Sequence, residues 1–213
     1  MGTVPMTERV VQGADCLAEG ARWLVAKEPR FAPALAAGPL PLRLKPQGFA
    51  TLLQAIMGQQ VSTASALAIW DRLEVAGLTD ADAVARATGD DLRACGLSRQ
   101  KIRYAHALAR AGTDWPALET LPTPQVIQTL MAVTGVGRWT AEIYAKFSLG
   151  RADVFAAGDL ALQEGARMLF ALPERPSERE LRRMAQDWSP WRSVAARALW
   201  AYYAKQKSRE GIT

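Results

Sequence analysis

The pattern of apolar and polar positions predicts a chain that is helical almost throughout. Alternation typical of strands is scarce, and alanine, leucine and arginine dominate the stretches between glycine and proline residues. Helices of this kind are stabilised by burying one apolar face, so most of their residues serve the core. The sequence therefore predicts an all-α fold.

Capping and helix-breaking residues set the expected bounds of these helices. Ser62 or Thr63 is expected to cap one helix and Ser98 another, because a hydroxyl accepts from an amide of the first turn. Prolines spread between residues 29 and 46 predict an irregular connection there. We expect helices at 10–26, 49–57, 64–73, 79–88, 90–94, 99–111, 125–133, 138–147, from 159 or 160 onward, 177–186 and 191–205.

Composition adds a mild preference for anionic partners. Among 213 residues, 26 Lys and Arg stand against 21 Asp and Glu, a net charge of +5 that favours polyanions without requiring them. The N-terminus lacks the plan of a signal peptide, and no apolar run reaches membrane-spanning length. A cytoplasmic protein without membrane contact is therefore expected.

Cysteine and histidine usage excludes two kinds of metal centre. Cys16 and Cys95 stand far apart without a CxxC partner, which excludes a four-cysteine iron–sulfur cluster and favours free thiols. His106 is the only histidine and lies in a helical stretch, so no histidine-based metal site is expected.

The most informative stretch is a glycine hairpin followed by a lone carboxylate. Gly135-Val136-Gly137 lies between two apolar-periodic segments, and Asp159 follows the short hydrophobic run 154–157. Backbone N–H groups of such a turn and of the following helix N-terminus bind an anion, because the helix dipole favours negative charge there. A DNA phosphate is the expected anion, with Gly135, Gly137, Arg138 and Thr140 around it.

These motifs resemble the helix-hairpin-helix DNA glycosylase superfamily, in its alkylbase (3-methyladenine II) branch. The similarity runs from about Phe31 to Tyr203 and is strongest in three places: the GQQVS turn, the hairpin through Asp159, and the segment from PWRS to Trp200. Three separated motifs in family order are far more specific than the GVG hairpin alone.

The resemblance implies an organisation of two helical lobes with a DNA-binding cleft. Lobe A is expected at about 1–48 plus 153–213, and lobe B at about 49–152 with the hairpin motif at 125–147. The chain has no room for the extra N-terminal α/β domain of longer relatives, so a single compact unit acting as a monomer is expected.

The resemblance makes Asp159 the catalytic residue. The family places its catalytic aspartate after a V-F/W-x-x-x-D approach, about twenty residues beyond an aromatic that Trp139 matches. A carboxylate there stabilises an oxocarbenium-like sugar or orients water. Alkylation has already made the base a cationic leaving group, so one aspartate suffices once the nucleotide is flipped. The alternative is that Asp159 is only a helix N-cap.

The resemblance also assigns a base pocket around Trp139. Bifunctional relatives carry a lysine there that attacks the sugar, so an enzyme without lyase activity is expected. Trp139 stacks on the cationic base in this hypothesis; in the alternative it packs between the hairpin helices. Ile143 replaces an aromatic of some relatives and has Tyr144 beside it, which predicts a pocket that is either more open or less rich in stacking groups. Glu142 either favours cationic bases or faces solvent.

The C-terminal and GQQVS motifs supply the remaining expected contacts. Trp200 matches a second pocket tryptophan, whereas Trp188 and Trp191 are expected to pack the last helix. Gln60 matches the residue that fills the gap left by the flipped base, and Gln59 would contact the opposite strand. Alternatively, both glutamines bond the backbone of the turn.

Two further groups are candidates for contacts with ions. The resemblance implies a monovalent cation, Na⁺ or K⁺, on backbone carbonyls that match Met131, Val133 and Val136. Basic side chains either meet phosphates or belong to the solvated surface; they are Arg138, Lys146, Arg151 and Arg192.

Two functions follow from these residues. The first is a monofunctional DNA glycosylase that hydrolyses the N-glycosidic bond of alkylated purines (3-methyladenine, 7-methylguanine) in duplex DNA by base flipping. The alternative is a non-catalytic hairpin protein that binds DNA or an abasic site. Asp159 and Trp139 at the family's catalytic spacing favour the enzyme, because a pure binder needs neither.

Overall fold

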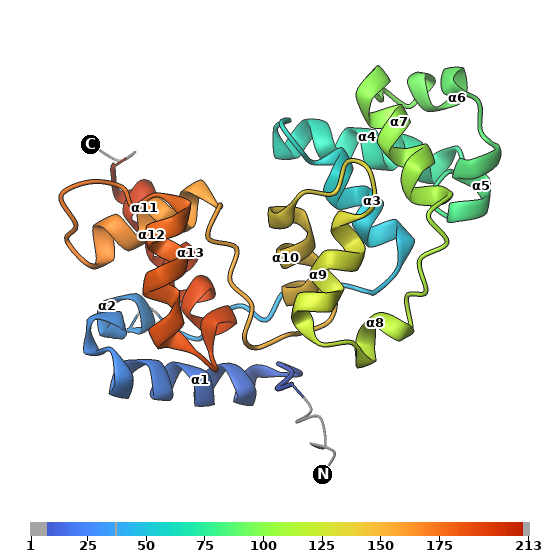
Figure 1. Cartoon of the computed structure of the whole chain (residues 1–213). Helices are drawn as coiled ribbons and strands as arrows, with labels where there is room; N and C mark the ends of the chain where they lie inside the picture. The colour runs from blue at the N-terminus through green and yellow to red at the C-terminus, as the bar shows by residue number, and fades with distance from the viewer. Residues whose placement is uncertain (1–7, 37, 211–213) are drawn as a thin grey trace, which may run out of the picture. The chain divides into compact units, whose positions relative to one another are not determined.

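Helices are the regular elements of the described part of this protein. The structure, a computed structural model, describes residues 8–36 and 38–210. In chain order the elements are α1 (Ala14–Lys27), η1 (Pro29–Phe31), α2 (Ala32–Leu35), α3 (Phe49–Met57), α4 (Thr63–Val75), α5 (Ala81–Arg86), α6 (Gly89–Ala94), α7 (Arg99–Ala109), α8 (Ala117–Thr120), α9 (Thr123–Met131), α10 (Arg138–Phe147), α11 (Leu160–Leu169), α12 (Glu178–Met184), η2 (Ala185–Trp188) and α13 (Arg192–Glu210) (Figure 1). The all-α prediction is confirmed.

The apolar pattern predicted α3 and α10 with the bounds that the structure shows. Prolines caused the main errors. Pro29 and Pro33 lie in the first turns of η1 and α2, where a missing N–H costs nothing, so the connection 29–46 is helical in its first part. For the same reason α9 begins at Thr123, before Pro124. The first helix starts later than predicted, because Val10 lies in an isolated antiparallel bridge with Arg151.

The chain divides into two compact units. Unit 1 comprises Met1–Leu44 and Ala145–Thr213, and unit 2 comprises Lys45–Tyr144. The expected lobe borders at 48 and 152 therefore differ from the observed borders at 44 and 144. Residues 1–7, 37 and 211–213 of the predicted lobe A lie outside the described residues.

Unit 1 is built around the pairing of α11 with α13, which lie side by side (Figure 1). Gly165 makes this possible, because a Cβ there would lie 2.8 Å from the backbone oxygen of Leu199. Trp191 packs over Gly20 of α1, and Trp188 makes edge contacts with Phe31. Trp188 and Trp191 are 3% and 2% exposed, so the prediction that they pack the last helix is confirmed.

The start of α13 is fixed by an ion pair rather than by a solvent contact. Arg192 donates from Nε and Nη2 to the two carboxylate oxygens of Asp153, at 2.6 and 2.7 Å, and Ser189 Oγ donates to the same carboxylate at 2.8 Å. Burial acts to raise the pKa of Asp153, but these hydrogen bonds outweigh it and hold the pKa below its ordinary value. Arg192, which was expected either to meet a phosphate or to lie on the solvated surface, is used here to fix the start of α13.

Unit 2 packs α3 against α7. Four residues of α3 are fully buried: Leu52, Leu53, Ile56 and Met57. Ser62 caps α4 by accepting from Ser65 N, and Ser98 caps α7 by accepting from Lys101 N, as predicted. Within the described residues, none of the helices is long and apolar enough to span a bilayer.

Replacing Gly165 by alanine should destabilise the protein by about 1–3 kcal/mol, because α11 must move away from α13 to admit the new methyl group. Urea unfolding followed by circular dichroism measures this. Gly13→Ala is the control, since nothing lies within 4 Å of a Cβ at that position. Equal unfolding midpoints for Gly165→Ala and the parent would contradict the packing argument.

Asp153→Asn should lower stability at neutral pH but not in strong acid. The folded pKa of Asp153 is depressed, so its stabilisation is present above the unfolded pKa and is lost as the pH falls through the folded pKa. The pair is about a third exposed. Water screens it, which limits the effect to about 1 kcal/mol. Thermal unfolding of variant and parent between pH 2 and pH 7 should show curves that converge only at the acid end.

Candidate active site and nucleic-acid interface

The hairpin between α9 and α10 depends on Gly135 for two reasons. Its φ of +96° lies in the left-handed region, and a Cβ would clash with the ring of Tyr104. The turn is closed by Val136 N, which donates to the carbonyl of Val133 at 3.0 Å. Gly137 is exposed, and nothing lies within 4 Å of the position of its Cβ. The start of α10 is therefore open to an anion at its positive end.

The first turn of α10 combines an exposed arginine with buried polar groups. The Arg138 side chain is 52% exposed and lies 3.8 Å from a carboxylate oxygen of Glu142, which is 2% exposed. Glu142 therefore does not face solvent, contrary to one of the two expectations. Thr140 is also 2% exposed, and its hydroxyl accepts from Gln59 Nε2 at 3.0 Å. Its hydroxyl is thus used inside the protein, which leaves only its backbone for an external anion.

The GQQVS turn is joined to the hairpin by Gln59. Besides Thr140, the Gln59 amide donates to the carbonyl of Gly135 at 3.2 Å, so Gln59 serves as a tether between two turns of unit 2. Lys101 of α7 holds the end of α3 by donating to Met57 O at 2.5 Å. Gln60 is exposed and adopts a φ of +56°. The two glutamines therefore differ: Gln59 bonds a backbone, and Gln60 stands at the surface.

The expected base-pocket residues of α10 have unequal exposure. Trp139 is 39% exposed, a large apolar area for a side chain at a helix start, and Ile143 is half-buried. Tyr144 is 3% exposed; its hydroxyl accepts from Gly48 N at 2.8 Å, and its ring packs on Trp115. Burial raises the pKa of the Tyr144 hydroxyl. Tyr144 therefore belongs to the core of unit 2 and not to an open pocket wall.

Asp159 is the N-cap of α11. The run 154–157 that precedes it is buried, and Asp159 N donates to Ala156 O at 2.9 Å, which fixes the approach to the helix. The carboxylate oxygen Oδ1 accepts from Leu162 N at 3.0 Å, as the capping interpretation predicts. The same oxygen accepts from Nε1 of Trp200 at 3.1 Å. Asp159 is half-buried, so it is both anchored and partly accessible.

Trp200 lies in α13 with aromatic and basic neighbours. Its ring stacks on Phe147 with centroids 5.9 Å apart, and the side-chain nitrogen of Lys146 lies 4.3 Å from the ring centroid. Lys146 is 1% exposed and is therefore no surface phosphate contact, contrary to expectation. Arg151 is also buried, and it lies 3.2 Å from a carboxylate oxygen of Glu8. Sequence reasoning missed the cluster of Lys146, Trp200 and Asp159, because no local pattern shows that a lysine will be buried.

Metal-binding side chains do not gather in the described residues, where no group of three or more His, Cys, Asp or Glu is placed to hold an ion. The carbonyls proposed for a monovalent cation are of the right chemical type. Met131 ends α9, at the negative end of that helix dipole, and hard cations take carbonyl oxygens as ligands. Val133 O accepts one hydrogen bond, from Val136 N, which leaves its second lone pair for an ion. These residues therefore offer the type of ligand that such a cation takes.

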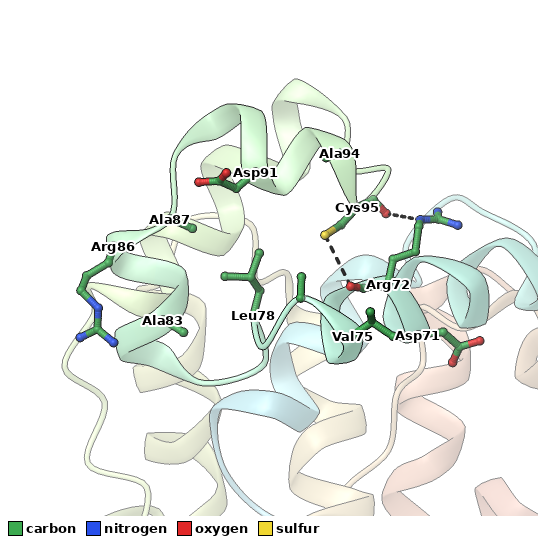
Figure 2. Close-up of a pocket in the computed structure, with 11 residues that line it drawn as sticks. Asp71, Arg72, Val75, Leu78, Ala83, Arg86, Ala87, Asp91, Ala94 and Cys95 are labelled. Carbon is green, nitrogen blue, oxygen red and sulfur yellow. Dashed lines mark hydrogen bonds between the residues drawn. The ribbon is translucent and has the colours of Figure 1, made fainter.

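A cavity of about 730 Å³ lies elsewhere in unit 2 and contains none of the predicted site residues. Figure 2 shows it among α4, α5 and α6, with Cys95 and Arg72 joined by two hydrogen bonds at one side. Burial raises the pKa of the Cys95 thiol, so this cysteine is not an activated nucleophile. The lining offers apolar surface but no arrangement of acid, base and nucleophile.

Comparisons with known proteins agree with the motifs. The family model described as HhH-GPD superfamily base excision DNA repair protein matches residues 53–190. DNA-3-methyladenine glycosylase 1 of Schizosaccharomyces pombe is 30% identical over 165 residues, which are 73% of this chain and 72% of that protein. The solved structure of DNA-3-methyladenine glycosidase from Bacillus halodurans superimposes with a TM-score of 0.80, 29% identity and 95% coverage of both chains. That of Schizosaccharomyces pombe 3-methyladenine DNA glycosylase in complex with abasic DNA gives a TM-score of 0.73 with 28% identity, and covers 85% of this chain and 95% of that one. The resemblance read from the motifs is confirmed, and the chain belongs to the HhH-GPD superfamily of base excision DNA repair proteins.

Proposed function

We propose that this protein is a monofunctional DNA glycosylase that hydrolyses the N-glycosidic bond of alkylated purines, 3-methyladenine and 7-methylguanine, in duplex DNA. The observation that carries the proposal is Asp159, a half-buried carboxylate whose Oδ1 is held by two N–H donors at the family's catalytic spacing from Trp139. The relatives named above are 3-methyladenine glycosylases, which supports the same substrate class. In a bacterium, a protein with this function would act in the cytoplasm, with the nucleoid.

In this proposal, the hairpin of unit 2 binds the DNA backbone. The exposed Gly137 and the first-turn amides of α10 face a phosphate, and Arg138 adds a positive side chain. A Na⁺ or K⁺ ion on the carbonyls of the α9–α10 turn would add positive charge for the same phosphate. Gln60 stands exposed on the neighbouring turn and fills the gap that the flipped nucleotide leaves. These contacts read no base, so they suit an enzyme that searches duplex DNA.

The chemistry of the proposed reaction needs few protein groups. The protein cannot reach the glycosidic bond of a base that is stacked inside the duplex. The nucleotide is therefore flipped out before that bond breaks. Asp159 then stabilises the positive charge that develops on the sugar, and it orients the water that adds to the anomeric carbon. The alkylated base leaves as a neutral purine, because its positive charge disappears when the bond electrons move onto the ring. Trp139 offers no amine to the sugar, so the product is an intact abasic strand.

A second candidate is a non-catalytic protein that binds DNA or abasic sites through the hairpin. The observation that favours it is the ordinary capping geometry of Asp159, which any helix N-cap would show. The two candidates differ in what happens when only the charge of Asp159 is removed.

Asp159→Asn should abolish base release while leaving DNA binding intact. Asparagine is an equally good N-cap, so the helix keeps its start, but it carries no charge to stabilise the sugar cation. We expect the single-turnover rate on methylated duplex DNA to fall by at least about a hundredfold. Release of free 3-methyladenine and 7-methylguanine is measured by chromatography.

Asp80→Asn is the matched control for that experiment. Asp80 is also a helix N-cap whose carboxylate accepts from the third residue on, Ala83 N, at 2.8 Å. This variant should release base at the parental rate. Tight duplex binding by a parent that releases no base would favour the non-catalytic candidate. Parental base release by Asp159→Asn would instead show that the protein is a glycosylase in which Asp159 serves only as the helix N-cap.

Trp139→Ala should weaken the productive binding of cationic bases. Stacking of a cation on an indole contributes about 0.5–2 kcal/mol, which predicts a loss of roughly 2- to 30-fold in the rate at limiting enzyme. Trp139→Phe should retain part of the activity, because a smaller ring still stacks. An unchanged rate for Trp139→Ala, with an unchanged melting temperature, would show that the exposed indole does not meet the base.

A further inference from the structure

A buried lysine lies against the tryptophan that holds the candidate catalytic carboxylate. Lys146, in the last turn of α10, is 1% exposed, and its nitrogen lies 4.3 Å from the centroid of the Trp200 ring. The same nitrogen lies 5.7 Å from the centroid of Phe147. Burying a lysine ammonium group costs free energy of folding. A functional role would explain why such a group lies inside unit 1.

The edge of the same tryptophan points at Asp159. Trp200 Nε1 donates to Oδ1 at 3.1 Å, and Leu162 N donates to that oxygen at 3.0 Å. Two donors on one oxygen fix the rotation of the carboxylate about its Cβ–Cγ bond. The carboxylate as a whole therefore has a defined orientation.

We propose that Lys146 is a positioning residue that acts through Trp200: its ammonium polarises the indole, strengthens the Nε1–H bond to Asp159 and so holds that carboxylate in the orientation it needs toward the sugar. A cation over an indole face is attracted by the π electrons, and the electron density drawn toward it makes the ring N–H a better donor. The orientation of Asp159 is thus set by a residue that never meets the substrate.

This arrangement also changes the role of Trp200. Its face already interacts with a lysine, and a second cation, such as an alkylated base, gains little from a ring that a positive charge has polarised. Trp200 therefore serves as a hydrogen-bond donor to Asp159, whereas the exposed Trp139 is left to stack on the base. The sequence had favoured Trp200 as a pocket wall.

A neighbouring arginine has a different, structural role. Arg197 lies over the Phe147 ring at 4.8 Å, but its guanidinium donates to Ser193 Oγ and to Leu42 O, at 2.6 and 3.0 Å. Burial lowers the pKa of Arg197 to about 10. Its hydrogen bonds tie α13 to the chain before unit 2, so Arg197 does not take over the place of Lys146 at Trp200.

The inference rests on the proposed glycosylase function and is tested with the full chain. Lys146→Met keeps an unbranched buried side chain and removes the charge, and Lys146→Arg keeps a charge that stacks on aromatic rings. Lys205→Met removes the same charge from an exposed position of α13 and is the matched control. Each variant is assayed for single-turnover base release, for the Kd of duplex DNA with an abasic-site analogue, and for melting temperature.

A readout independent of activity is the indole N–H resonance of Trp200. It is assigned in ¹H–¹⁵N spectra as the peak that Trp200→Phe lacks. In Lys146→Met it should move upfield, because a weaker hydrogen bond deshields the proton less. Base release should fall about tenfold with Kd unchanged, and Lys146→Arg should recover most of the rate.

Two outcomes would overturn the inference. One is a rate for Lys146→Met within about twofold of that of Lys205→Met. The other is a slower rate with an unmoved Trp200 resonance, which would show a merely structural role. Either leaves the proposed function intact if the parent releases base. If the parent releases none, the proposed function fails. The positioning role of Lys146 in base release then fails with it, even where the Trp200 resonance moves.

Discussion

The close approach of α11 to α13 is the constraint on which the candidate site of unit 1 depends. Gly165 admits the backbone of Leu199 to a distance that any side chain would forbid. Trp200 follows Leu199 directly, and Asp159 caps the helix that contains Gly165. The indole–carboxylate hydrogen bond is thus a consequence of helix packing, and a small change at Gly165 would alter the orientation of Asp159 as well as stability.

The capping role of Asp159 and its proposed catalytic role are compatible. A carboxylate has two oxygens, and the cap and the tryptophan both use Oδ1. An N-cap is moreover a rigid support, since the helix amide that it bonds cannot move independently. A carboxylate that must meet a developing cation gains from such support, because little reorganisation is left for the moment of reaction.

The sequence could predict those features that depend on local pattern. Apolar spacing gave α3 and α10, and hydroxyl caps gave the starts of α4 and α7. The position of Asp159 before α11 was visible in the same way. The ion-pair and hydrogen-bond partners of charged and polar side chains could not be predicted, because they come from distant parts of the chain. Lys146, Arg151 and Arg192 all looked like surface charges, and each is buried or paired through contacts that only the fold creates.

The proposed nucleic-acid interface of unit 2 is held by hydrogen bonds within the protein itself. Gln59 bonds both Gly135 and Thr140, so the GQQVS turn and the hairpin form one support, and Lys101 adds a bond to the end of α3. Gly135 lies so close to the Tyr104 ring that the ring also limits movement of the hairpin. Gln60 and Gly137 are exposed on this support. The proposed wedge and phosphate site are held by shared hydrogen bonds, so they would lose little conformational entropy on meeting DNA. More of the binding energy would then be available for unstacking a damaged base.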